Sequence, residues 1–201
     1  WDFKTPEQVQ PREWVRVNGQ PVVWESCQTF SGSWGYHRDE TTWKSVEQLV
    51  QLLADCVSKG GNLLLNVGPT GRGTFDDRAL ASLAGIGRWM KLCGRSIYGC
   101  GPAPRGLAAP SGCRLTHNAA AGRLYLHIFE WPIQELHLDG LAGKVRYAQL
   151  LHDASEVIMK EQTAQSGPHS YSQSGKDTLT LRLPVRKPDL AVPVVELVLR
   201  Q

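Results

Sequence analysis

The sequence predicts an α/β region followed by an all-β region. In the first hundred residues, apolar runs typical of buried strands alternate with stretches that carry a helical hydrophobic stripe. Beyond Pro102 the apolar segments are short and alternate with a period of two, as in half-buried antiparallel strands. The stretch between them, "GPAPRGLAAPSG", has no periodicity and is typical of a linker. We therefore expect one domain over residues 1–101 and a second over residues 102–201.

Two strand–helix pairs are expected in the first domain. The strands are residues 21–27 and the apolar run "NLLLNVGP", which is typical of a strand buried on both faces of a parallel sheet. The helices are "SVEQLVQLLADCVSKGG", ended by Gly60 and Gly61, and "DDRALASLAGIGRWMKLCG", with Asp76 and Asp77 at its positive N-terminal end. Two such units cannot close a sheet or cover both of its faces, so further strands are expected beside them.

The second domain contains five segments with strand character. They are "GRLYLHIFEWP", "QELHLDGL", "VRYAQLLHD", "DTLTLRLP" and "VVELVLRQ". Short strands at this spacing, separated by Gly and Pro turns, predict an antiparallel β-sandwich. The polar stretch at residues 161–177 is expected to be a surface loop.

Composition excludes several classes of function. The net charge is +3 and no long basic or acidic run occurs, which argues against nucleic-acid binding. No apolar run approaches the roughly 18 residues of a membrane-spanning helix. The five cysteines are widely spaced, so we expect free thiols and no zinc finger. The histidines show no metal-ligand spacing either, and neither a metal nor a cofactor is expected.

The segment "GSWGYHRDETTWKS", residues 32–45, is the candidate site. It follows a predicted strand and precedes a predicted helix, the position of substrate loops in parallel α/β barrels. Four of the seven tryptophans lie in one 30-residue window around it, which suits sugar stacking but also ordinary packing. Asp39 and Glu40 fit a proton donor, and they equally fit carboxylates that stabilise the N-terminus of the coming helix.

Five motifs in series carry a resemblance to a known family. "DFKTPEQ", "WESC", "SWGYHRDETTWKS", "VSKGGNLLLNVGPTGRG" and "IGRWMKLCGRSIYG" resemble, in this order, the second half of the α-L-fucosidases of glycoside hydrolase family 29. The segment "GRLYLHIFEWP" is similar to the first strand of that family's β-sandwich. The resemblance implies the last βα units of a TIM-like (β/α) barrel, a C-terminal β-sandwich, and retaining hydrolysis of terminal α-linked L-fucose. It also implies a nucleophilic Asp on an earlier barrel strand, outside this chain.

The resemblance also assigns site residues. The acid/base falls at Glu40 or Asp39, because the family differs at this point, and we expect Glu40. The position of Gln28 holds a sugar-contacting Arg in some members, and Gln28 keeps hydrogen-bonding capacity without the charge. Aromatic and polar contacts are expected from Trp34, Tyr36 and His37. Leu64, or its neighbour Leu63, would pack against the C6 methyl group of fucose, although both fit plain barrel core.

The expected partners are a fucosylated glycan and a polypeptide that carries the N-terminal half of the barrel. A homo-oligomer is compatible with the sequence, whereas nucleic acid and membrane are not expected partners. The family implies a secreted, periplasmic or lysosomal location. The rival hypothesis is a non-catalytic carbohydrate-binding protein, which would bind glycan even with both acids replaced by amides.

Overall fold

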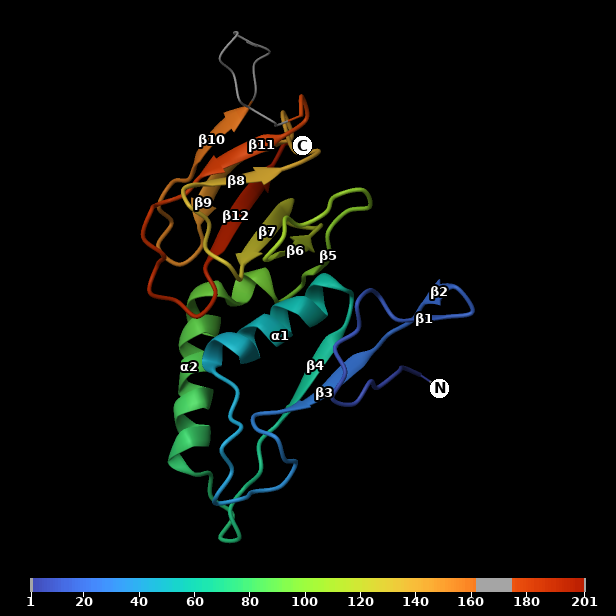
Figure 1. Cartoon of the computed structure of the whole chain (residues 1–201). Coiled ribbons are helices and arrows are strands. Elements are labelled where there is room, and N and C mark those ends of the chain that lie inside the picture. Colours follow the sequence, from blue (N-terminus) through green and yellow to red (C-terminus); the bar gives the residue numbers. More distant parts are fainter. Residues whose placement is uncertain (1, 162–174, 201) are drawn as a thin grey trace.

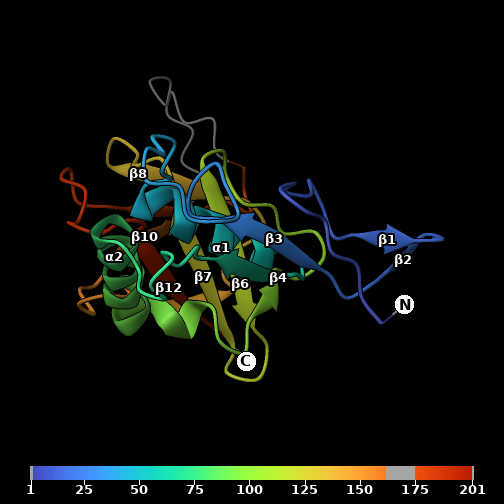
Figure 2. The same ribbon diagram turned by 90° about the horizontal axis from the view of Figure 1, so that it is seen from below.

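The computed structural model describes residues 2–161 and 175–200, and it contains both expected regions (Figure 1). A small parallel sheet lies at one side, one helix lies on it and a second packs beside the first, and a two-sheet β-sandwich lies on the helices (Figures 1 and 2). The expected loop at 161–177 falls almost wholly outside the described residues. Within them no helix is long and apolar enough to cross a membrane.

The parallel sheet consists of β3 (Glu25–Thr29) and β4 (Asn62–Asn66), connected through α1 (Val46–Ser58). Glu25 pairs with Asn62 and Thr29 with Asn66. On the other edge of β3, residues 4–8 run parallel to it through backbone hydrogen bonds. The described residues thus form an open sheet in which β4 pairs with β3 alone, and they do not close a barrel.

The first expected strand is displaced along the chain. Residues 20 and 21 belong instead to a hairpin of β1 (Arg16–Val17) and β2 (Gln20–Pro21). Asn18 and Gly19 connect these strands with φ values of 50° and 78°. An Asn-Gly pair with two positive φ angles is the preferred two-residue hairpin turn. The apolar run that predicted a strand over 21–27 therefore spans the end of β2, the connection after it and the start of β3.

Both helices begin at the residues that the sequence indicates. Ser45 caps α1: its side chain accepts from the Gln48 backbone N–H, and the Gln48 side chain accepts from the Ser45 N–H. Asp76 caps α2 (Asp77–Cys93) by accepting from the Ala79 N–H. Such caps satisfy backbone donors that have no partner inside the helix. A short 3₁₀ turn, η1 (Gly94–Ser96), follows α2.

The sandwich has a five-stranded sheet in the order β5-β6-β7-β12-β9 and a three-stranded sheet in the order β10-β11-β8. Its strands are β5 (Gly101–Pro102), β6 (Cys113–Asn118), β7 (Arg123–Ile128), β8 (Glu135–Leu138), β9 (Val145–Leu150), β10 (Ile158–Glu161), β11 (Leu179–Arg182) and β12 (Val194–Leu199). All five expected strands are present, and β5, β6 and β10 were not predicted. One face of β6, β7 and β12 packs against the smaller sheet and forms the sandwich core.

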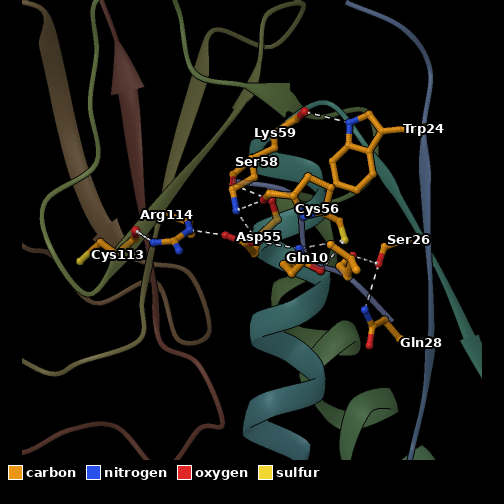
Figure 3. Close-up of polar contacts among 12 residues, drawn as sticks. Gln10, Trp24, Ser26, Gln28, Asp55, Cys56, Ser58, Lys59, Cys113 and Arg114 are labelled. Carbon is orange, nitrogen blue, oxygen red and sulfur yellow. Dashed lines mark hydrogen bonds and ion pairs between the residues drawn. The ribbon is translucent and has the colours of Figure 1, made fainter. Parts of the chain in front are cut away.

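The opposite face of the five-stranded sheet packs against α1 and α2. Trp89 of α2 is buried there and its indole N–H donates to the carbonyl of Val192 (2.7 Å). Asp55 of α1 accepts from Lys59 (2.6 Å), from Gln10 (2.6 Å) and from Arg114 of β6 (Figure 3). Burial opposes ionisation of Asp55, but these donors outweigh it and lower its pKa. Apolar packing and a buried ionic network therefore join the α/β region to the sandwich.

Candidate active site

The loop between β3 and α1 lies at the carboxyl end of the parallel sheet (Figure 1). Asn66, the last residue of β4, donates from its side-chain amide to the carbonyl of Trp34 (2.6 Å). Two residues after Asn66, the backbone of Gly68 approaches the loop so closely that a Cβ on Gly68 would lie 2.6 Å from the backbone nitrogen of Tyr36. The ends of both strands thus hold this loop in place, as expected for a substrate loop of a parallel α/β fold.

The carboxylate of Glu40 is turned into its own loop. Its Oε1 accepts from the backbone N–H (2.7 Å) and the hydroxyl (2.6 Å) of Thr42, and its Oε2 accepts from the Ser33 hydroxyl (3.0 Å). The bonds from Thr42, followed by that from Ser33, lower the pKa of Glu40 to about 2. Donors that favour the charged form stabilise the carboxylate, so this geometry makes Glu40 a charged acceptor that shapes the loop.

Asp39 has the opposite environment. Its side chain is 75% exposed, and within the described residues it contacts the neighbouring Arg38, at 3.4 Å from Nε to Oδ1. An ion pair between two such exposed side chains contributes little energy. The carboxylate of Asp39 is therefore free to meet a ligand.

The aromatic and histidine side chains of the loop are accessible. Trp34 is 41% exposed and Tyr36 is 39% exposed, and His37 is exposed beside them. A small cavity lies beneath this part of the loop, and it is lined by Tyr36, His37, Glu40, Trp43 and Asn66 among others. The cavity thus brings together Tyr36, His37 and Glu40, whereas Trp34 and Asp39 are exposed elsewhere on the same loop.

The two faces of the parallel sheet separate Leu64 from Gln28. Leu64 is 49% exposed on the face away from α1. Gln28 is buried, points from β3 toward α1, and donates to the Ser26 hydroxyl (3.1 Å; Figure 3). Gln28 thus lies on the helix side of the sheet, because successive side chains of a strand point to opposite faces. The expected contact between Gln28 and substrate stays a prediction.

Four residues in and around the loop were not anticipated from sequence. Asn66 could have been found, since it ends a predicted parallel strand. Thr42 and Ser33 hold the loop through hydrogen bonds to Glu40, and no sequence pattern predicts such bonds. Arg78 comes from the first turn of α2 and donates to the carbonyls of Arg38 (3.1 Å) and Glu40 (2.8 Å). This contact joins segments about 40 residues apart and leaves no sequence signal.

Comparisons with known proteins agree on one family. Residues 1–95 match the family model described as "Alpha-L-fucosidase". An α-L-fucosidase of Dictyostelium discoideum is 35% identical over 115 residues, which are 56% of this chain and 25% of that protein. The plasma α-L-fucosidase of Homo sapiens is 42% identical over 81 residues, which are 39% of this chain and 17% of that protein.

Solved structures extend the likeness to the sandwich. α-L-Fucosidase isoenzyme 1 from Paenibacillus thiaminolyticus matches 100% of this chain with a TM-score of 0.87 and 37% identity, over 45% of its own length. An α-fucosidase of Thermotoga maritima, solved with a mechanism-based inhibitor, matches 98% with a TM-score of 0.74 and 30% identity, over 43% of its length. This chain spans less than half the length of either protein.

The motifs, the loop at the ends of β3 and β4, and the match to both domains of solved relatives agree with one another. On these grounds the chain is similar to the α-L-fucosidases over less than half of their length.

Proposed function

We propose that this chain takes part in the hydrolysis of terminal α-L-fucosides and supplies the acid/base loop. The observation that carries the proposal is the loop at residues 30–45: it bears two carboxylates and exposed aromatics at the carboxyl ends of parallel strands, in a chain similar to the α-L-fucosidases. Aromatic faces stack on sugar rings, and Leu64, exposed on the same sheet, suits a sugar that carries a methyl group.

A retaining mechanism needs two carboxyl groups about 5–5.5 Å apart. We propose that one is an Asp outside these 201 residues. It attacks the anomeric carbon as the glycosidic C–O bond breaks, while the acid/base gives its proton to the leaving oxygen. The same acid/base then takes a proton from the water that releases fucose. No cofactor enters these steps.

We assign the acid/base role to Asp39 and revise the sequence-based preference for Glu40. A general acid must have a carboxyl oxygen free to meet the leaving oxygen. The hydrogen bonds to Glu40 keep its pKa near 2, so it would arrive charged, and both of its oxygens are already occupied. Asp39 has a free, exposed carboxylate one residue earlier.

We further propose that β3, α1, β4 and α2 are the last units of a (β/α) barrel. The unpaired edge of β4 and the exposed Leu64 support this, because an open edge and bare apolar side chains favour association with further strands. The remaining units, on the same polypeptide or on a partner, would complete the barrel and bring the nucleophile. We refer to this assembly as the complete enzyme.

The test is release of aryl alcohol from aryl α-L-fucosides by the complete enzyme, with native mass spectrometry of its polypeptides. Asp39→Asn should lower kcat/KM about 10²- to 10⁴-fold, the usual contribution of a general acid. Glu40→Gln should lower it less, since an amide retains acceptor capacity toward Thr42. Glycan binding without hydrolysis, unaffected by either amide, would favour the carbohydrate-binding hypothesis and refute the catalytic one.

A further inference from the structure

Arg78 holds the backbone on both sides of Asp39. Its Nη2 donates to the carbonyl oxygen of Arg38 (3.1 Å) and its Nη1 to that of Glu40 (2.8 Å). These carbonyls belong to the residues immediately before and after Asp39. A guanidinium is planar and has several donors in a fixed fork, so it can bridge two acceptors that a single ammonium would not span.

The guanidinium is itself fixed from two other sides. Asp76 accepts from its Nε (3.1 Å) and its Nη2 (2.7 Å), and the ring of Trp43 lies 4.8 Å from its central carbon. Asp76 is anchored in turn, because its other oxygen caps α2 by accepting from the Ala79 N–H (3.0 Å). The position of Arg78 is therefore set by the start of a helix, and the charge-assisted bonds it makes are stronger than neutral ones.

The loop is tied from the inside as well. The Glu40 carboxylate binds Thr42 and Ser33, and the Trp43 indole N–H donates to the Glu40 carbonyl (3.2 Å). Residues 38 and 40 are thus held by backbone contacts, while the Asp39 side chain projects free between them.

We propose that Arg78 is a positioning residue for the acid/base: it fixes the backbone around Asp39 and so sets the distance from the Asp39 carboxyl group to the leaving oxygen. This inference rests on the proposed function and adds a residue on a separate helix to it. A displacement of about 1 Å at a reacting group can cost about 10²-fold in rate. Loss of Arg78 should therefore impair the proton-transfer step more than binding.

The experiment separates proton donation from every other step by the choice of leaving group. The complete enzyme is assayed with phenyl α-L-fucoside, whose leaving oxygen needs a proton, and with 2,4-dinitrophenyl α-L-fucoside, whose leaving group departs without one. We use kcat/KM, because it reports the steps up to departure of the leaving group and leaves out the later attack of water. For Arg78→Ala we expect kcat/KM on the phenyl substrate to fall about 30- to 100-fold, by the misplacement argument. On the dinitrophenyl substrate kcat/KM should fall less than about 3-fold in the same variant, because that leaving group draws little on general acid catalysis.

Two further variants grade the effect. Arg78→Lys keeps a positive charge but cannot bridge both carbonyls, so its loss should be intermediate and should keep the same substrate pattern. Asp76→Asn keeps the helix cap and removes the charge partner of Arg78, so it should give a smaller loss of the same kind. Arg88→Ala, an exposed arginine on the same helix, is the matched control and should leave both rates unchanged.

The outcomes distinguish this inference from the proposed function. An equal loss on both substrates, or no loss on either, would overturn the positioning role of Arg78. If Arg78→Ala fails to fold, Arg78→Lys and Asp76→Asn decide by the same comparison. If Asp39→Asn shows no preference for the phenyl substrate, the assignment of Asp39 itself fails, whatever Arg78 does.

Discussion

Acid should weaken the packing of the sandwich against α2 through one buried histidine. His127 of β7 is fully buried next to Trp89. Its Nε2 lies 2.9 Å from the Thr116 hydroxyl, and that hydroxyl donates its only proton to the Ser96 carbonyl (2.7 Å). Nε2 must therefore carry the hydrogen, and Nδ1 is left buried without a partner. Protonation at Nδ1 would create a buried N–H with no acceptor.

This arrangement sets both the sign and the size of the effect. Burial lowers the pKa of His127 from 6.5 to about 3. Below pH 6.5 the His127 side chain binds a proton in the unfolded chain but not in the folded protein. The free energy of unfolding therefore falls as the pH falls, and it levels off near pH 3. At about 1.4 kcal/mol per pH unit, the loss between pH 6.5 and 4.5 is about 3 kcal/mol. On the strands and the 3₁₀ turn around His127, Arg95 and Arg123 pair with Glu196, and Arg114 pairs with Asp55. On α2, whose Trp89 lies beside His127, the charged residues are Asp77, Arg78, Arg88 and Lys91.

The assay is the free energy of unfolding in urea at pH 7 and pH 4.5, on the complete enzyme and its His127→Gln variant. Gln retains a donor for Thr116 but does not titrate, so the variant should lose about 3 kcal/mol less than the parent on acidification. Carboxylates contribute equally to both proteins and cancel in the difference. The matched control is His137→Gln, which replaces an exposed histidine on β8. This variant should keep the steep pH dependence of the free energy of unfolding because His127 remains. Parallel pH curves for parent and His127→Gln would refute the reasoning, as would an imidazole NMR titration of folded His127 near pH 6.5.

Two further predictions concern stability and use the same urea measurement. Gly87→Ala should stabilise by about 1 kcal/mol through helix propensity, since a Cβ there meets nothing within 4 Å. Gly85→Ala should destabilise despite the same propensity gain, because its Cβ would lie 2.6 Å from Val46 of α1; equal effects at both glycines would disprove the packing argument. Asp55→Asn should lower the free energy of unfolding by about 3 kcal/mol, which is near the low end for breaking a buried ion pair. The loss is at the low end because the side chain of its partner Arg114 is 37% exposed and can be hydrated. An unchanged midpoint for that variant would mean that the network adds nothing to stability.

Periodic patterns and helix caps made most of the fold predictable. The stripe that starts at Val46 and the cap at Asp76 located both helices, and alternation located five strands of the sandwich. β6 was missed because "CRLTHN" has only two apolar residues, Cys113 and Leu115, which face the sandwich core. Its other face is polar although it points to the helices, where Arg114 and Thr116 bind Asp55 and Ser96. So short an alternation is a weak strand signal.

The position of the candidate site in the sequence was predictable, but the conformations of its side chains were not. The motif located the loop, and Trp34, Tyr36 and His37 are indeed gathered in it. The choice between Asp39 and Glu40 depended on which side chain folds back onto the loop, and hydrogen bonds decide this locally. Gln28 was assigned by the resemblance alone: it lies beyond the end of the expected strand, so alternation could not indicate its face of β3.

α2 connects the sandwich to the loop mechanically. Arg78 and Trp89 are eleven residues apart, which is close to three full turns, so both lie near the same side of the helix. At one end Trp89 is locked to Val192 of the sandwich, and at the other Arg78 holds the backbone around Asp39. The 17-residue helix α2 spans about 25 Å. Close packing of Gly85 on Val46 opposes rotation of α2 about its axis relative to α1. The sandwich therefore supports α2, and through α2 it holds Arg78 and the backbone around Asp39. A substitution that loosens the packing of Trp89 should lower the rate on the phenyl substrate more than the rate on the dinitrophenyl substrate, as expected for Arg78→Lys.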